Sequence, residues 1–217
     1  MEPAHPLGIV AALWRYPTKS LRFEALERTE IGERGLPGDR SGALFVASPD
    51  HARSGKTFRG KEHHLLHTVA EPEAAISLAA LDGVRLEERT DGPFFDSRPV
   101  SLIFDRWLAE LETVLGMQLD PLRFRPNIFV RAAGAVANER DLVGKTLRVG
   151  EAELRVAEPI ERCVTPSYDV QSGERQPQVQ RAVVGTRNNV MGIYCTVERA
   201  GTVALGDEIL SARGERA

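Results

Sequence analysis

The sequence predicts a mostly β, barrel-like protein in which two β-rich lobes flank one helix. Short apolar runs recur between turn-forming residues along most of the 217 residues, a pattern typical of strands. Only one segment has its apolar residues at helical spacing. No linker rich in glycine or serine separates the two halves, so we expect the lobes to pack together.

The N-terminal half begins with the apolar run Leu7–Trp14, which is predicted to be a buried strand. A loop rich in glycine and proline covers Arg34–Arg40 and leads into a second strand at Ala43–Ala47. Residues 81–84 are predicted to form a hairpin turn, because an Asp-Gly pair tolerates positive φ. Two weaker strand candidates are His64–Ala70 and Ala75–Ala80.

The helix is predicted over Ser101–Leu115, and Gly116 is its expected C-terminal stop. Its apolar face contains Leu102, Trp107, Leu108, Leu111, Val114 and Leu115. Strands are then predicted at Phe124–Val130, Thr146–Val149, Glu153–Ala157, Gly192–Val197 and Val203–Leu205. We place the lobe boundary within residues 90–125 and write the two lobes as 1–95 and 96–217.

The composition excludes several classes of protein. The net charge is −3, with 28 basic and 31 acidic residues, so no overall field attracts nucleic acid or an anionic membrane. No stretch approaches the length of a membrane span, and residues 1–7 lack a signal pattern. Cys163 and Cys195 are too few for a disulfide-stapled scaffold. We expect a cytoplasmic protein with free thiols, although one Cys163–Cys195 bridge stays possible on sequence grounds.

Two turns carry groups that could bind an anion. Lys19 and Ser20 follow the first strand and offer a cation and a hydroxyl donor. In the Arg34–Arg40 loop, glycines allow the backbone to approach a ligand, and Arg40 offers a forked cation. On spacing alone, a solvated turn is the preferred reading of both segments.

Two further segments carry less common combinations. Arg125 and Asn127 alternate with apolar residues, so a strand would place both on one face. An inward arginine needs a reason, which is either a ligand or an internal carboxylate. Cys163 follows Arg162, and a neighbouring cation favours the thiolate, a soft ligand for a redox metal. Taken alone, a free cysteine is more often a buried filler.

Other familiar sites are not indicated. His63 and His67 stand four residues apart, with His64 between them, but the segment is predicted as strand and has no HExxH motif. We therefore interpret these histidines as surface or structural residues rather than zinc ligands. The sequence has no Walker loop, no GxGxxG after a strand, no GxSxG elbow and no CxxC pair.

The segments form an ordered set: YPTKSL at 16–21, GLPGDR at 35–40, DSRP at 96–99, FRPNIFV at 124–130, GKTLRVGEAELRV at 144–156, PIERCVTPSYDVQSG at 159–173, GIY at 192–194 and GTVALGDEI at 201–209. Together they resemble the MOSC family, the C-terminal domain of molybdenum cofactor sulfurase, with its N-terminal β-barrel partner domain. The resemblance covers roughly Leu7 to Leu210. The most similar branch is the mitochondrial amidoxime reducing component and its bacterial relatives. The resemblance implies a mostly β MOSC barrel with a few helices and with a MOSC_N-like β lobe packed on it.

The resemblance also implies roles for individual residues. Cys163 corresponds to the cysteine that ligates molybdenum, and Asp96 is a second catalytic candidate with a proton or water role. The implied contacts to the molybdenum–molybdopterin cofactor are Lys19, Ser20, Arg40, Ser97, Arg98, Arg125, Asn127, Arg162, Cys163 and Tyr194. Arg98 and Glu161 depart from the family pattern, as does the loosened turn at Tyr168–Gly173, and these departures concern the substrate pocket.

The function implied is reduction of small N-hydroxylated compounds, such as amidoximes and hydroxylamines, by oxygen-atom transfer. Two cysteines cannot ligate an iron–sulfur cluster in the usual manner, and no flavin signature is present. A separate donor protein is therefore expected, ferredoxin-like, a flavin reductase or cytochrome b5-like. The alternative is a module that carries sulfur or cofactor on the same cysteine without turnover.

Overall fold

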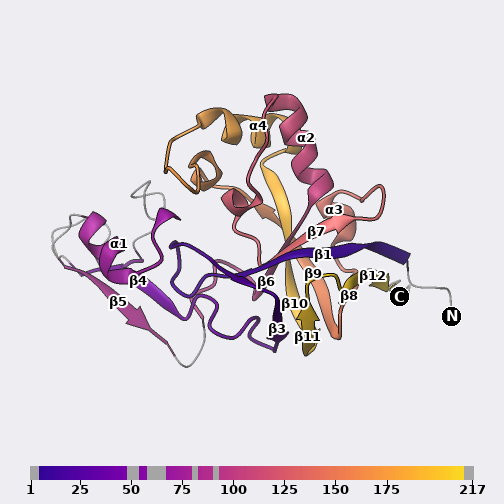
Figure 1. The fold of residues 1–217 in the computed structure, drawn as a ribbon, viewed down its shortest axis with the longest axis horizontal. Coiled ribbons are helices and arrows are strands. Elements are labelled where there is room, and N and C mark those ends of the chain that lie inside the picture. Colours follow the sequence, from indigo (N-terminus) through magenta and orange to yellow (C-terminus); the bar gives the residue numbers. More distant parts are fainter. Residues whose placement is uncertain (1–4, 48–53, 58–66, 80–82, 90–92, 213–217) are drawn as a thin grey trace.

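A closed β-barrel forms the centre of the protein (Figure 1). The computed structural model describes residues 5–47, 54–57, 67–79, 83–89 and 93–212. The strands are β1 His5–Arg15, β2 Glu24–Leu26, β3 Arg28–Ile31, β4 Gly42–Val46, β5 Val84–Glu88, β6 Val100–Phe104, β7 Ile128–Ala132, β8 Thr146–Val149, β9 Ala152–Glu161, β10 Val190–Arg199, β11 Gly201–Ala204 and β12 Glu208–Ala212. The helices are α1 Pro72–Ala79, α2 Asp105–Leu115, α3 Glu139–Leu142 and α4 Pro177–Arg187, with short 3-10 helices η2 Pro121–Phe124 and η3 Thr165–Ser167.

The barrel is closed by strands from both ends of the chain. Its order is β12-β8-β9-β10-β6-β7-β1, and β12 returns to pair with β1. Neighbouring strands are antiparallel except β6 and β7, which are parallel and joined through α2. A parallel pair needs such a crossover, whereas an antiparallel pair can be joined by a short turn. The prediction of a mostly β barrel is confirmed.

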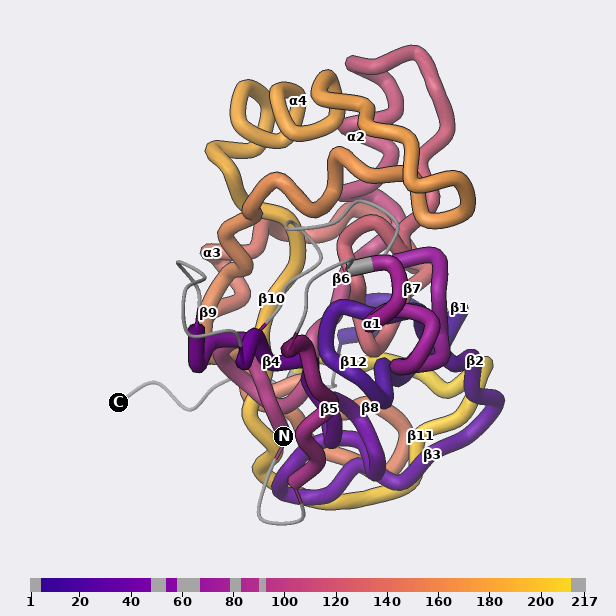
Figure 2. The backbone as a smooth tube through the Cα atoms, turned by 90° about the vertical axis from the view of Figure 1, so that its left-hand side faces the viewer, coloured from indigo at the N-terminus to yellow at the C-terminus, as the bar shows by residue number. Residues whose placement is uncertain are grey.

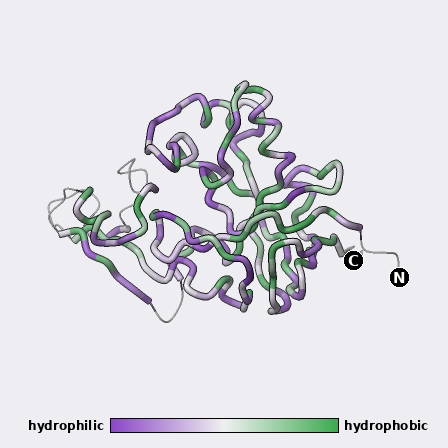
Figure 3. The backbone as a smooth tube through the Cα atoms, in the orientation of Figure 1, coloured by the Kyte–Doolittle hydropathy of each residue, from purple (hydrophilic) through white to green (hydrophobic). Residues whose placement is uncertain are grey.

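The barrel interior is the main hydrophobic core. Leu102, Ile128, Leu154 and Ile193 have no exposed surface and come from four different barrel strands. Hydrophobic stretches run through these strands in Figure 3. Side chains that point inward along each strand therefore fill the barrel. This packing makes the barrel rigid, so that it holds the residues at the end of the barrel in place.

Helices α2 and α4 pack against each other beside the barrel (Figure 2). The predicted helix corresponds to α2. Its predicted start at Ser101 is wrong, because Val100–Phe104 is the fully buried strand β6 and the helix begins at Asp105. Its predicted stop is confirmed, since Gly116 is left-handed with φ 63° and donates to Glu112 O. The few helices expected of the fold are present, but only α2 had been located from its sequence pattern.

A small lobe lies to the side of the barrel and consists of β4, β5 and α1 (Figure 1). Residues Ala75–Ala79 of the weak strand candidate at Ala75–Ala80 are helical, so that prediction is wrong. In the candidate at His64–Ala70, His67 and Thr68 form a helical turn, and 64–66 lie outside the described residues. Of the predicted turn at 81–84, Gly83 has φ 86°, and 81–82 lie outside the described residues.

The sheet pairing crosses the predicted boundary between residues 95 and 96. Strand β1 is a member of the barrel, and β3 pairs with β11 near the C-terminus. The division into two domains stays a prediction. The N-terminal segment supplies the barrel strand β1, which pairs with β7 on one side and with β12 on the other, so that neither of those strands is left with an unpaired edge. Among the described residues, no helix has the length and apolar character needed to span a bilayer.

Candidate functional site

A cavity of about 290 Å³ lies where the barrel, the 3-10 helices and the small lobe meet. Its lining comprises Lys19, Ser20, Arg40, His67, Asp96, Ser101, Arg123, Phe124, Arg125, Ile160, Glu161, Arg162, Cys163, Thr165, Pro166 and Tyr194. Eight of the predicted site residues are in this set, although they come from six separate stretches of sequence. The fold therefore brings together Lys19, Ser20, Arg40, Asp96, Arg125, Arg162, Cys163 and Tyr194.

Lys19 and Ser20 enter the cavity from the tight turn that follows β1. Ser20 has φ 73°, and the Lys19 N–H donates to Gly42 O at 2.8 Å, which fixes the turn against β4. Lys19 Nζ forms an ion pair with Asp96 Oδ1 at 2.6 Å. Desolvation by the surrounding protein opposes the ionisation of Asp96, but the Lys19 ammonium outweighs this effect and holds the pKa of Asp96 below its usual range.

Arg40 and Arg125 both lie against the ring of Tyr16. Their guanidinium carbons are 5.0 Å and 4.1 Å from the ring centroid, which are cation–π distances. Arg40 is also paired with the buried carboxylate of Asp39, whose Oδ1 accepts from the Tyr16 N–H at 2.7 Å. Tyr16 is therefore a fully buried platform that sets the position of both cations.

Arg125 carries the least compensated charge in the cavity. Its Nη1 donates to Leu21 O at 2.8 Å, whereas its buried Nη2 has no hydrogen-bond partner among the described residues. Burial lowers the pKa of Arg125 to about 10, so the guanidinium is still charged at neutral pH. A half-buried cation with a buried, unused donor favours an anionic or oxygen-rich ligand.

Asn127 does not join Arg125 in the cavity, which corrects the prediction that both share one face of a strand. Residues 124–127 precede β7, and Arg125 is left-handed with φ 50°. The Asn127 side chain is buried and accepts from the Ser101 N–H at 3.0 Å while donating to Trp14 O at 3.2 Å. Asn127 therefore links β6 to β1 and is not itself a lining residue, although its partner Ser101 lines the cavity.

Cys163 is exposed at the cavity edge, just after the end of β9, and both cysteines of the chain are free. Its Sγ lies 3.1 Å from Thr165 Oγ1. The neighbouring Arg162 uses its guanidinium on main-chain oxygens, with Nε to Met191 O at 2.7 Å and Nη1 to Phe124 O at 2.9 Å. Arg162 thus holds three walls of the cavity together, and burial lowers its pKa to about 10.

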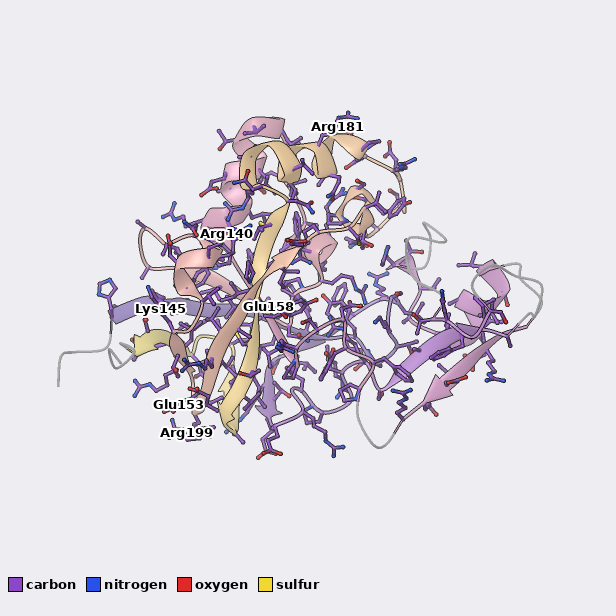
Figure 4. The ribbon with its side chains drawn as sticks, turned by 180° about the vertical axis from the view of Figure 1, so that it is seen from behind. Arg140, Lys145, Glu153, Glu158, Arg181 and Arg199 are labelled. Atoms are coloured by element: carbon purple, nitrogen blue, oxygen red, sulfur yellow. The ribbon has the colours of Figure 1, made fainter. Side chains whose placement is uncertain are left out.

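Ser97 and Arg98 lie outside the cavity lining. Both face Glu158 on β9: Ser97 Oγ hydrogen-bonds to Oε1, and Arg98 Nε is 3.8 Å from the same atom. Figure 4 shows Glu158 midway along β9, well separated from the Glu153–Arg199 pair, in which Glu153 lies at the start of β9. Tyr194, on β10, does line the cavity, and burial raises the pKa of its hydroxyl, which therefore stays protonated at neutral pH.

Two buried ionisable residues of the cavity, Arg123 and His67, were not predicted as site residues. Arg123 directly precedes the FRPN motif and is 4% exposed. Its Nη2 donates to Asp169 Oδ2 and Gln176 Oε1, both at 2.7 Å, which holds the segment after Cys163 in place. His67 is 6% exposed, and its Nδ1 is 3.4 Å from Arg125 Nη1. Of the two interpretations given for it, surface or structural, its burial favours the structural one. His63 and His64 lie outside the described residues.

The donor side chains of the cavity fit a cofactor that is negatively charged and that supplies most of the metal ligands itself. The described residues contain no group of three or more potential protein metal ligands, so a metal here would rest on Cys163 and on atoms supplied by the cofactor. Lys19, Arg40 and Arg125 supply cations, and the unused Nη2 of Arg125 supplies a donor. A phosphorylated pterin that carries its own sulfur ligands has these properties.

The fold and site define a β-barrel protein with a basic, thiol-containing ligand cavity. A MOSC domain model matches residues 89–210, more than half of the 217-residue chain. The chain belongs to the MOSC domain family, a family associated with binding of the molybdenum cofactor. This assignment confirms the resemblance drawn from the motifs. No curated protein matches the sequence significantly.

Two solved structures show the same fold at low sequence identity, and a third is a weaker match. The YuaD protein from Bacillus subtilis is 20% identical with a TM-score of 0.57, over 95% of this chain and 97% of that chain. A hypothetical protein is 14% identical with a TM-score of 0.50, over 96% and 70% of the two chains. YiiM from Escherichia coli is 13% identical with a TM-score of 0.47, over 99% and 72%. The likeness to the first two concerns the fold alone.

Inorganic phosphate should stabilise the cofactor-free protein by filling this cavity. At 100 times its dissociation constant, a ligand of the folded state adds about 2.7 kcal/mol to the free energy of unfolding. We expect Arg125→Met to lose most of this gain, and Arg155→Met, which removes an exposed arginine of β9, to keep it. Thermal unfolding with and without phosphate, at matched ionic strength, measures the difference. An equal gain in both variants would place the anion elsewhere.

Proposed function

We propose that the cavity binds a molybdenum–pterin cofactor with Cys163 as the protein ligand of the metal, and that the loaded protein reduces N-hydroxylated compounds. The observation that carries the proposal is the convergence of an exposed thiol with three cationic side chains in one cavity. Lys19, Arg40 and Arg125 would hold the phosphate and pterin, with Ser20 as a further donor. When bound, the cofactor supplies a two-electron redox centre that accepts an oxygen atom.

The side chains around Cys163 would position the substrate. The Lys19 ammonium keeps Asp96 ionised, so its carboxylate accepts a hydrogen bond from the N–OH group rather than donating a proton at rest. The Tyr194 hydroxyl keeps its proton and serves as a donor on the same cavity wall. In the overall reaction an N–O bond breaks: the amidoxime takes up two electrons and two protons and yields an amidine and water.

The electrons would come from a separate donor protein, ferredoxin-like, a flavin reductase or cytochrome b5-like. In this proposal the barrel supplies the site of substrate reduction and the donor supplies the reducing equivalents. A reduced viologen dye can replace the donor in the test, so that the assay depends on this chain and not on a partner.

The decisive experiment is to produce the protein in cells that make the cofactor and to measure molybdenum and pterin per chain. We expect near-stoichiometric loading and dye-dependent reduction of benzamidoxime to benzamidine. Protein free of both molybdenum and pterin under these conditions would contradict the proposal.

A carrier function is the second candidate, and the exposure of the Cys163 thiol favours it. A carrier must present its cysteine to other proteins, and this thiol is accessible without any rearrangement. Mass spectrometry distinguishes the two cases. A stable persulfide on Cys163 without pterin supports the carrier, whereas loaded cofactor with turnover supports the reductase.

A further inference from the structure

The peptide unit between Met191 and Gly192 is held by side chains rather than by the sheet. Between Val190 and Ile193 the register of β10 against β9 shifts, which marks a β-bulge at this point. The Met191 carbonyl accepts from Arg162 Nε at 2.7 Å, and the Gly192 N–H donates to Glu139 Oε1 at 3.1 Å. Arg162, which lines the cavity, and Glu139, a buried carboxylate on α3, therefore bind the same peptide unit, one at its C=O and the other at its N–H. We call this pair of contacts the clamp.

The bulge requires glycine at position 192. Gly192 has φ 95°, a conformation that other residues rarely adopt. A Cβ atom there would lie 2.9 Å from Ile103 Cγ1, 3.0 Å from Leu102 O and 3.1 Å from Arg162 Nη2. Because glycine has no side chain, the backbone at Gly192 lies close to β6 and to Arg162, and the Arg162 guanidinium reaches the Met191 carbonyl.

Glu139 is fixed on its other side by Arg187 at the end of α4. Arg187 Nη2 lies 2.7 Å and 2.6 Å from the two carboxylate oxygens, and Glu139 is 3% exposed. Arg187 also pairs with the exposed carboxylate of Glu110 and lies 5.7 Å from the ring centroid of Trp107. Helices α2 and α4 therefore anchor the carboxylate that holds the bulge.

We propose that Glu139 is a positioning residue for the cofactor site, acting through the Met191–Gly192 peptide and Arg162 on Cys163. Arg162 is adjacent to Cys163 in sequence and bonds to Phe124 O just before Arg125, so its placement sets both the thiol and the half-buried cation. Glu139 itself does not line the cavity. The inference rests on the proposed function in that the ligand to be held is the molybdenum cofactor.

Glu139→Gln tests this role, with Glu110→Gln as the matched control. Both carboxylates pair with Arg187, but of the two only Glu139 also accepts from the Gly192 N–H. Both oxygens of Glu139 accept from Arg187, so in either orientation the NH₂ group of a glutamine faces Arg187 and two donors oppose each other. Glu139→Asp is the second variant, because the shorter side chain keeps a charge for Arg187 but withdraws from Gly192.

The variants are purified from cofactor-producing cells, and three quantities are measured: molybdenum per folded chain, the visible absorption of the bound metal, and hydrogen exchange of the Gly192 N–H in cofactor-free protein. We expect Glu139→Gln and Glu139→Asp to lose about 10-fold in molybdenum content, as for other residues that support a metal ligand indirectly, with an altered spectrum and faster Gly192 exchange. Glu110→Gln should match the wild type in all three.

The outcomes separate the two proposals. If Glu139 variants exchange faster at Gly192 but load molybdenum with a wild-type spectrum, Glu139 has only a structural role and the inference is overturned. If the wild type itself contains no molybdenum, the proposed function fails, and so does the part of the inference that concerns the cofactor. If hydrogen exchange at Gly192 is unchanged in both Glu139 variants, Glu139 does not hold the Gly192 N–H, and the inference is overturned.

Discussion

Cys163→Ala should abolish molybdenum loading and lower amidoxime reduction by at least about 100-fold, more than an indirect supporting residue typically costs. Among the described residues, this thiol is the one sulfur that lines the cavity, and its removal takes away the proposed metal ligand. Because the side chain is exposed, the free energy of unfolding should change by less than about 0.5 kcal/mol. Metal analysis, the dye-linked assay and urea unfolding of the same preparation give the three numbers.

Cys195→Ala is the matched control for this experiment. Cys195 is buried in the barrel on β10, and burial raises its pKa to about 12, so it is a packed thiol and not a reactive one. Its replacement should cost about 1 kcal/mol through the small cavity it leaves, while molybdenum per folded chain stays at the wild-type level. Full turnover in Cys163→Ala, or lost loading in Cys195→Ala, would show that the ligand has been assigned to the wrong residue.

The strands were predictable where apolar runs are bounded by turns. Leu7–Trp14, Ala43–Ala47 and Thr146–Val149 coincide with β1, β4 and β8 to within a few residues. Helix α4 was missed because the residues it buries, Val179, Ala182 and Val183, are few and small. The first helix was predicted to start too early because a strand buried on both faces, such as β6, has the same apolar content as a buried helix turn.

The site was predictable only in part, because its geometry depends on distant segments. The motifs named eight of the lining residues, but the strand prediction for Phe124–Val130 assigned Arg125 and Asn127 to one face. The left-handed turn at Arg125 sends them apart. No local pattern marks His67 as a cavity residue, since its burial comes from the packing of the small lobe against Arg125 and Tyr168.

His67 should make the protein markedly less stable as the pH falls from 7 to 5. Burial, assisted by the nearby Arg125 charge, lowers the pKa of His67 to about 3, from an ordinary value of about 6.5. Below pH 6.5 the unfolded chain therefore takes up a proton that the folded protein does not, and stability falls by up to about 1.4 kcal/mol per pH unit until the folded pKa is reached. Between pH 7 and pH 5 this amounts to roughly 2 kcal/mol.

His67→Gln separates this effect from other titrations. Glutamine offers an oxygen as the acceptor for Arg125 but takes up no proton in this range, so the variant should lose most of the slope between pH 7 and pH 5. His5→Gln, at the exposed start of β1, is the matched control and should keep the wild-type slope. Urea unfolding at half-unit pH steps measures both. Ordinary carboxylates titrate mainly below pH 5, so they contribute little to the slope between pH 7 and pH 5. If the slope survives in His67→Gln, His67 is not its source. His67 would then take up its proton in the folded protein, in a cavity that is open to water beside Arg125.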